Sequence, residues 1–138
     1  MDAISLFYIN NIGFAIELKY IYKSMSISNI KKLPNLPPQL LSFTVFNEQI
    51  VPIYNLAHFF NINRFNTNYL LFFSKNNIIL SFAVEKIDTT TNYQIIKSEN
   101  ITNISFLNKN KILLCNNMNH FLLDYFMLFQ ASEMKINE

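Results

Sequence analysis

The side chains best suited to catalysis or metal binding in this sequence are two histidines and one cysteine. His58 lies in the segment LAHFF and His120 in the segment MNHFL, so each imidazole has aromatic neighbours. An imidazole can act as a general base or a metal ligand, but either role requires a suitable partner group close by. No ligand spacing surrounds either histidine, and we interpret both as partly buried structural residues. Cys115 lies in the apolar segment ILLCN, so we expect a small buried side chain there rather than a reactive thiol.

The acidic residues form no paired-carboxylate motif of the kind that general acid–base catalysis uses. Those considered for such a role are Glu17, Glu48, Glu85, Asp88, Glu99 and Asp124. Gly13 is the only glycine, which excludes a Walker A loop, a Rossmann fingerprint and a G-x-S-x-G nucleophile elbow. We therefore expect no enzymatic activity, no cofactor and no metal, and we interpret the chain as a module that acts by contact. A small enzyme remains an alternative, which a carboxylate within hydrogen-bond reach of His58 or His120 would support.

The composition predicts a folded protein of the cytoplasm. Hydrophobic residues make up 51% of the 138 residues and charged residues 14%, so the chain can bury a core. The net charge is +2 and Arg64 is the only arginine, so we expect no nucleic-acid partner. A single cysteine allows no internal disulfide, as is usual in a reducing compartment. The first residues lack a signal-peptide pattern and no apolar run reaches the roughly 18 residues of a membrane helix, so we expect no membrane insertion.

Short apolar runs separated by polar turns predict the strands that would position any functional side chain. We expect hairpins from residues 3–9 with 13–16, 40–46 with 49–54, and 69–73 with 78–87. Asparagine occupies almost every expected turn, where it tolerates the positive φ that glycine otherwise supplies. Pro52 cannot donate a ladder hydrogen bond, so its strand should lie at an edge or a bulge.

The rest of the chain is patterned less clearly. We expect a further strand pair at 101–107 and 111–115 with its turn at 108–110, and polar or weakly patterned chain at 88–100. The apolar residues at 18, 21, 22 and 25 predict one face of a short helix, followed by a loop at 24–29. Residues 56–60 predict a helical turn and 61–68 a polar connector between two β-rich halves. The whole chain, 1–138, then forms a single all-β domain with helical additions.

The apolar run 121–129 is expected to form a C-terminal helix. Asp124 is its only polar residue, so this helix would be apolar nearly all round and would be buried or docked. The polar end, 131–138, is expected to fray.

Five motifs in chain order resemble the CheW family of bacterial chemotaxis coupling proteins. The segment LPNLP at 33–37 resembles the family's PN-x-P motif, and IVPIYNL at 50–56 resembles its V-I-P-V-V-D-L strand. FAI at 14–16 and the helix expected after it resemble Y-A-I-P-I-x-x-V-x-E-I. FAVEKI at 82–87 resembles G-x-V-V-D-x-V, and ITNI at 101–104 with ILL at 112–114 resembles Y-I-T-G-I and M-I-L-L-L-D.

This resemblance implies a fold and a function. The implied fold is a pair of interlocked five-stranded β-barrels of SH3-like type with a groove between them, short helices and a C-terminal helix. The implied function is that of a non-catalytic adaptor, monomeric when free. Its implied partners are the cytoplasmic tips of chemoreceptors and the histidine kinase CheA, within membrane-associated receptor arrays.

The resemblance also implies contact positions. The receptor-contacting positions are Ile21, Asn47 and Glu48, and the kinase-contacting positions are Leu70, Ile87 and Thr90. Asn47 stands where the family has an arginine and Glu48 where it has a glycine, while Asn55 replaces a family aspartate. Losing the Arg-Gly pair removes a bidentate donor and adds a negative charge.

Alternatives remain at both levels. Ile21, Leu70 and Ile87 could instead be core residues, and Asn47 could simply be a turn residue with positive φ. At the level of function, the chain could be a CheW-like fold with altered partners, or a degenerate paralogue that couples nothing.

Overall fold

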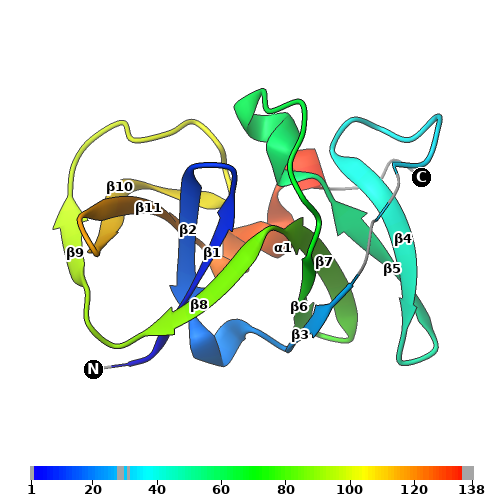
Figure 1. The fold of residues 1–138 in the computed structure, drawn as a ribbon, viewed down its shortest axis with the longest axis horizontal. Helices are drawn as coiled ribbons and strands as arrows, with labels where there is room; N and C mark the ends of the chain where they lie inside the picture. The colour runs from blue at the N-terminus through cyan, green and yellow to red at the C-terminus, as the bar shows by residue number, and fades with distance from the viewer. Residues whose placement is uncertain (1, 28–29, 31, 135–138) are drawn as a thin grey trace.

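The computed structural model describes residues 2–27, 30 and 32–134, and this part of the chain is mainly β (Figure 1). Eleven strands form two sheets that lie side by side (Figure 1). The six-stranded sheet has the order β8 (Lys86–Thr90), β1 (Ile4–Ile9), β2 (Ile12–Glu17), β11 (Met118–Leu123), β10 (Leu107–Cys115), β9 (Gln94–Lys97). The five-stranded sheet has the order β3 (Lys23–Ser26), β6 (Tyr69–Lys75), β7 (Ile78–Val84), β5 (Gln49–Tyr54), β4 (Leu40–Phe46). Pairing is parallel between β2 and β11 and between β5 and β7, and antiparallel in the other ladders.

The predicted fold class is confirmed: the fold is mainly β, with short helices and one C-terminal helix. The expectation of two closed five-stranded barrels needs correction. One sheet has six strands, and among the described residues the outer strands of each sheet have a ladder on one side only.

The five-stranded sheet nevertheless curls until a side chain of the outer strand β4 meets side chains near its other edge. Phe46 of β4 stacks on Phe72 of β6 with ring centroids 4.5 Å apart, and Tyr22, next to β3, lies edge-on to Phe46 at 5.9 Å. Asn47 Nδ2 donates to the Tyr22 hydroxyl at 3.0 Å. Aromatic packing therefore closes this sheet where the backbone ladder does not.

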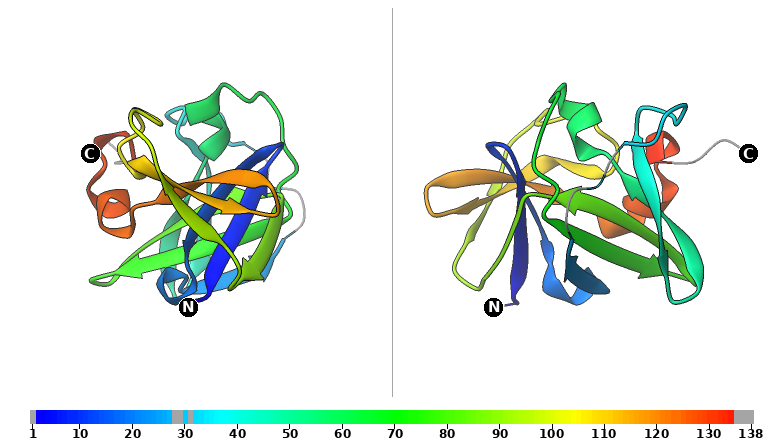
Figure 2. Two further views of the ribbon diagram at one scale, coloured as in Figure 1. Left: turned by 90° about the vertical axis from the view of Figure 1, so that its left-hand side faces the viewer. Right: turned by 45° about the vertical axis from the view of Figure 1, so that its right-hand side comes forward.

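The chain passes from one sheet to the other and back. Strands β1 and β2 belong to the six-stranded sheet, β3 to β7 to the other, and β8 to β11 return to the first. The connector 61–68 follows a 3-10 turn, η2 (Leu56–Phe60), and leads to β6 in the same sheet as β5 (Figure 2). The sequence placed a boundary between two β-rich halves near this connector. The two sheets divide the chain elsewhere, because the chain changes sheet after β2 and again after β7.

One hydrophobic core joins the two sheets. Its fully buried side chains include Phe7 and Phe14 of the six-stranded sheet and Phe73 and Phe82 of the five-stranded sheet. Phe106, before β10, packs 6.3 Å from Phe82 between ring centroids. A smaller apolar cluster lies within each sheet. No helix in the described residues is long and apolar enough to cross a bilayer.

Asparagine supplies the backbone conformations that tight turns require. Nine of the ten described residues with positive φ are asparagine, and the tenth is Glu48. The turns at 47–48, 76–77 and 116–117 have positive φ at both residues, the geometry of a type I′ hairpin turn. The expectation that asparagine replaces glycine at turns is confirmed.

The lone glycine has a packing role. Gly13 does not have positive φ, but a Cβ there would lie 2.5 Å from Cδ2 and 3.0 Å from Nε2 of His120. The ring of His120 thus lies directly against the backbone of β2, and a larger residue at position 13 would displace it.

Several element predictions were wrong. Residues 18–25 form a short 3-10 turn, η1 (Leu18–Tyr20), followed by the exposed strand β3, because β3 pairs with β6. Residues 88–90 belong to β8 and 94–97 form β9. Residues 101–106 do not form a strand. Residues 108–110 are not a turn, because β10 continues through them with a shift in its register to β11, and the turn between β10 and β11 lies at 116–117.

The C-terminal helix is shorter than predicted. Residues 121–123 end β11, and the helix α1 (Tyr125–Gln130) begins after Asp124, whose carboxylate accepts from the backbone N–H groups of Phe126 and Met127. Only Leu128 of α1 is buried, so most sides of this apolar helix are not enclosed by the rest of the protein. A 3-10 turn, η3 (Ser132–Met134), follows with Met134 buried, and the remainder of the predicted frayed end, 135–138, lies outside the described residues.

Pro52 does not mark an edge strand, because β5 lies between β4 and β7. Its pairing with β7 is confined to Ile53 and Tyr54, directly after the proline, and the Pro52 carbonyl accepts from the Ser81 hydroxyl at 2.8 Å. The missing N–H is therefore placed just outside the parallel ladder.

Candidate interaction surface

The two histidines and the cysteine do not form a catalytic group. The carbonyl of Leu113 accepts from Nδ1 of buried His120 at 3.3 Å, and Nε2 of the same ring shares a hydrogen bond with the Tyr8 hydroxyl at 2.9 Å. Burial, with the nearby charge of Asp88, raises the pKa of Tyr8. His58 is exposed, contrary to the expectation of a partly buried ring.

Cys115 is buried, as predicted. Within the described part of the chain, no group of three or more His, Cys, Asp or Glu side chains could hold a metal ion.

Two of the three positions implied as receptor contacts are neighbours in one turn, and the third, Ile21, precedes a residue that this turn contacts. Asn47 and Glu48 form the exposed turn between β4 and β5, with φ of 51° and 63°. The Asn47 amide reaches the hydroxyl of Tyr22, which directly follows Ile21. Ile21 is half-buried and packs against the main core, and it does not lie on a helix. Asn47 therefore has the turn conformation that its alternative interpretation required.

The three positions implied as kinase contacts do not form one surface. Leu70 is 2% exposed and belongs to the core within the five-stranded sheet. Ile87 and Thr90 lie in β8, an outer strand of the other sheet, and Ile87 packs partly against the main core. The Thr90 hydroxyl accepts from the backbone N–H of Asn92 at 3.0 Å. Burial of Leu70 favours its core interpretation, whereas β8 presents Ile87 and Thr90 nearer to solvent.

The structure adds an exposed apolar pair that the sequence interpretation did not include. Val45 of β4 and Ile50 of β5 are directly opposed across the hairpin and are 72% and 75% exposed. Phe43, also exposed, is opposed to Pro52 two residues farther from the turn. The alternation of side chains along a strand, counted back from a two-residue turn, would have placed this pair on one face.

We call Val45, Asn47, Glu48 and Ile50 the hairpin surface. It combines two strongly exposed aliphatic side chains, the turn amide and one carboxylate. Isolated exposed apolar residues are common, but a directly opposed pair beside a rigid turn is the kind of feature found at protein contacts.

Comparisons with known proteins agree with this interpretation of the fold. A search of curated proteins gives no match. The solved structure of the scaffolding protein TtCheW from Thermoanaerobacter tengcongensis is similar, with a TM-score of 0.72 and 14% identity over 96% of this chain and 90% of that one. The family model of the CheW-like domain matches residues 4–114, most of the sequence. The chain therefore belongs to the CheW-like domain family.

Proposed function

We propose that this protein is a non-catalytic adaptor of the chemotaxis type, which couples chemoreceptor tips to a CheA-type histidine kinase in the cytoplasm. The single observation that carries the proposal is membership of the CheW-like domain family over residues 4–114. The similarity to a scaffolding protein is consistent with it.

The hairpin surface is the proposed receptor contact. Its aliphatic pair can be desolvated without breaking any hydrogen bond, and its turn is held by the bond from Asn47 to Tyr22. A pre-ordered turn reduces the entropy lost on binding. The proposed kinase contact is the outer strand β8 around Ile87 and Thr90, where backbone groups on one side of the strand have no ladder partner among the described strands.

The receptor contact is tested by Ile50→Lys in a binding assay with a receptor-tip fragment from the same organism. We expect capture to weaken about tenfold or more, since an apolar contact would be replaced by a charge that must be desolvated. Ile78→Lys is the matched control, because Ile78 is also a strongly exposed isoleucine (61%) beside a hairpin turn. Equal effects of the two variants would contradict a contact at the hairpin surface.

A second candidate is a CheW-like interaction module with altered partners. The specific observation in its favour is the turn, which has Asn47 bound to Tyr22 and the carboxylate of Glu48 where the family resemblance implies Arg-Gly.

The variant Asn47→Arg separates the two candidates. Stronger receptor capture by this variant would place the turn against the receptor, and Tyr22→Phe controls for loss of the hydrogen bond alone. If neither the wild-type protein nor Asn47→Arg binds any receptor tip or CheA from its organism, the coupling function is wrong and the second candidate stands.

A further inference from the structure

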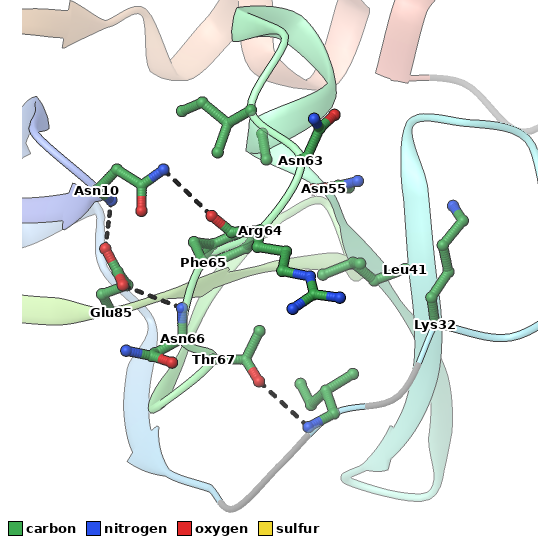
Figure 3. A pocket seen from close by; sticks show the side chains of 13 residues that line it. Asn10, Lys32, Leu41, Asn55, Asn63, Arg64, Phe65, Asn66, Thr67 and Glu85 are labelled. Atoms are coloured by element: carbon green, nitrogen blue, oxygen red, sulfur yellow. Dashed lines mark hydrogen bonds between the residues drawn. The ribbon is translucent and has the colours of Figure 1, made fainter.

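A pocket unrelated to the hairpin surface lies beside the connector 61–68 (Figure 3). Its volume is about 460 Å³, within the range of small-molecule sites. One wall is the connector, and the opposite wall includes Lys32 and Leu41 (Figure 3). The side chain of Arg64, the only arginine of the chain, extends from the connector into the space between these walls (Figure 3).

The connector is held in place by hydrogen bonds from both sheets. Glu85 accepts from the backbone N–H groups of Asn10 and Asn66 through its two carboxylate oxygens (Figure 3). The Asn10 amide donates to the carbonyl of Arg64 at 3.1 Å, and Thr67 Oγ1 accepts from the backbone N–H of Ile30 at 3.2 Å (Figure 3). These contacts fix the backbone on both sides of Arg64, so the pocket wall is ordered before any ligand arrives.

Among the described residues, one of the cations that line the pocket has no partner for its charged group. No side chain in the described residues makes a hydrogen bond or ion pair with the Arg64 guanidinium, and the one acidic side chain of the lining, Glu85, is occupied by backbone N–H groups. Lys32 Nζ donates to the carbonyl of Leu40 at 3.0 Å and retains further donors. Two cations against one engaged carboxylate make the lining positive.

The lining also has a polar part, which includes Asn55 and Asn63, and an apolar part. Leu41, Ala57, Ile62 and Phe65 contribute side chains to it, and the first two are buried. A guanidinium fork beside an aliphatic and aromatic wall matches a ligand with a planar carboxylate and a short hydrocarbon body.

We propose that this pocket binds a small organic carboxylate, with Arg64 as the bidentate donor, Lys32 as a second cation and the apolar wall against the hydrocarbon part. The proposal is independent of receptor or kinase coupling, since none of the hairpin-surface residues lines the pocket.

The test is a titration of the full-length protein with hexanoate and benzoate, followed by the backbone amide NMR signals of Asn66 and Thr67. We expect saturable shifts that Arg64→Gln weakens about ten- to hundredfold, the value of a charge-assisted bond. Lys109→Gln is the matched control, because Lys109 is an exposed cation outside the pocket, and this variant should bind like the wild type. Thermal unfolding of each variant confirms that the fold is retained.

Two further ligands define the chemistry. Hexanamide has the same hydrocarbon body without the charge and should give no saturable shift, and inorganic phosphate has the charge without the body and should bind more weakly than hexanoate. The proposal is overturned if neither acid produces saturable shifts at the connector, if Arg64→Gln binds like the wild type, or if phosphate or hexanamide binds as tightly as hexanoate.

Discussion

Replacing Glu48 with glycine should stabilise the protein, and the reason lies in the hairpin turn. Glu48 has φ of 63°, the left-handed region that disfavours a side chain, and it is the only described non-asparagine residue with positive φ. Type I′ turns strongly favour Asn-Gly at their two central positions. The family resemblance implies a glycine at this position, so Glu48→Gly also restores the expected pattern.

The expected magnitude follows from two opposing contributions. Relief of the left-handed conformation contributes about 1–2 kcal/mol. The greater freedom of glycine in the unfolded chain offsets about 0.5–1 kcal/mol of this gain. The net increase in unfolding free energy is then about 0.5–1 kcal/mol, or a rise in melting temperature of about 2–4 °C for a chain of this size.

Urea denaturation of wild type and variant measures this difference. Glu99→Gly is the matched control, because Glu99 is exposed but does not have positive φ. It should lower the unfolding free energy or leave it unchanged. A fall in stability for Glu48→Gly, or equal effects of the two variants, would refute the explanation by backbone strain.

Three other stability predictions follow from single contacts. Gly13→Ala should lower the unfolding free energy by about 1–3 kcal/mol, because the added methyl group overpacks against the His120 ring. In a His120→Ala background, Gly13→Ala should cost much less, and additive effects of the two substitutions in urea denaturation would contradict this explanation. Asp124→Ala should cost about 1 kcal/mol in urea denaturation by removing the helix cap, whereas Asp124→Asn should retain most of the stability, and equal losses would argue against capping. Burial raises the pKa of Tyr54 to about 12, above its unfolded value of 10, so the neutral phenol contributes stability that is fully present below pH 10 and is lost as pH rises through 12. Between pH 10 and 12 the unfolding free energy of Tyr54→Phe should therefore fall less steeply than that of the wild type, and identical pH profiles would exclude Tyr54 as the cause.

Local sequence signals predicted the hairpins well. The strands β4 and β5 match their expected bounds, because a proline-rich lead-in, alternating side chains and a two-residue turn all point to the same hairpin. The asparagine-rich turns were equally informative, since few other residues tolerate positive φ.

Tertiary pairing decided the elements that were predicted wrongly. The apolar residues in 18–25 have helical spacing, but hydrogen bonding to β6 makes residues 23–26 the strand β3 rather than part of a helix. The apolar run 121–129 is divided between β11 and α1, because β11 gains a parallel partner in β2 and Asp124 starts the helix. Such long-range partners are invisible to a local pattern.

The candidate site was predictable only in part. The resemblance identified the turn at Asn47 and Glu48, which is indeed exposed, but it also implied Leu70, which is buried in the core. A strand buried on both faces has no alternation that would separate core from contact residues. Alternation along β4 and β5 places Val45 and Ile50 on one face of the hairpin, but only the packing of the opposite face, where Phe46 stacks on Phe72, shows that their face is the exposed one.

The most direct test of the adaptor function is co-sedimentation of the purified protein with receptor-tip assemblies and CheA from its own organism. We expect the wild-type protein in the pellet when receptor-tip assemblies and CheA are present and in the supernatant when both are omitted. We expect Ile50→Lys to pellet much less than the wild type, while Ile78→Lys pellets like it. A wild-type protein that stays in the supernatant with every receptor and CheA of that organism would contradict the proposed coupling.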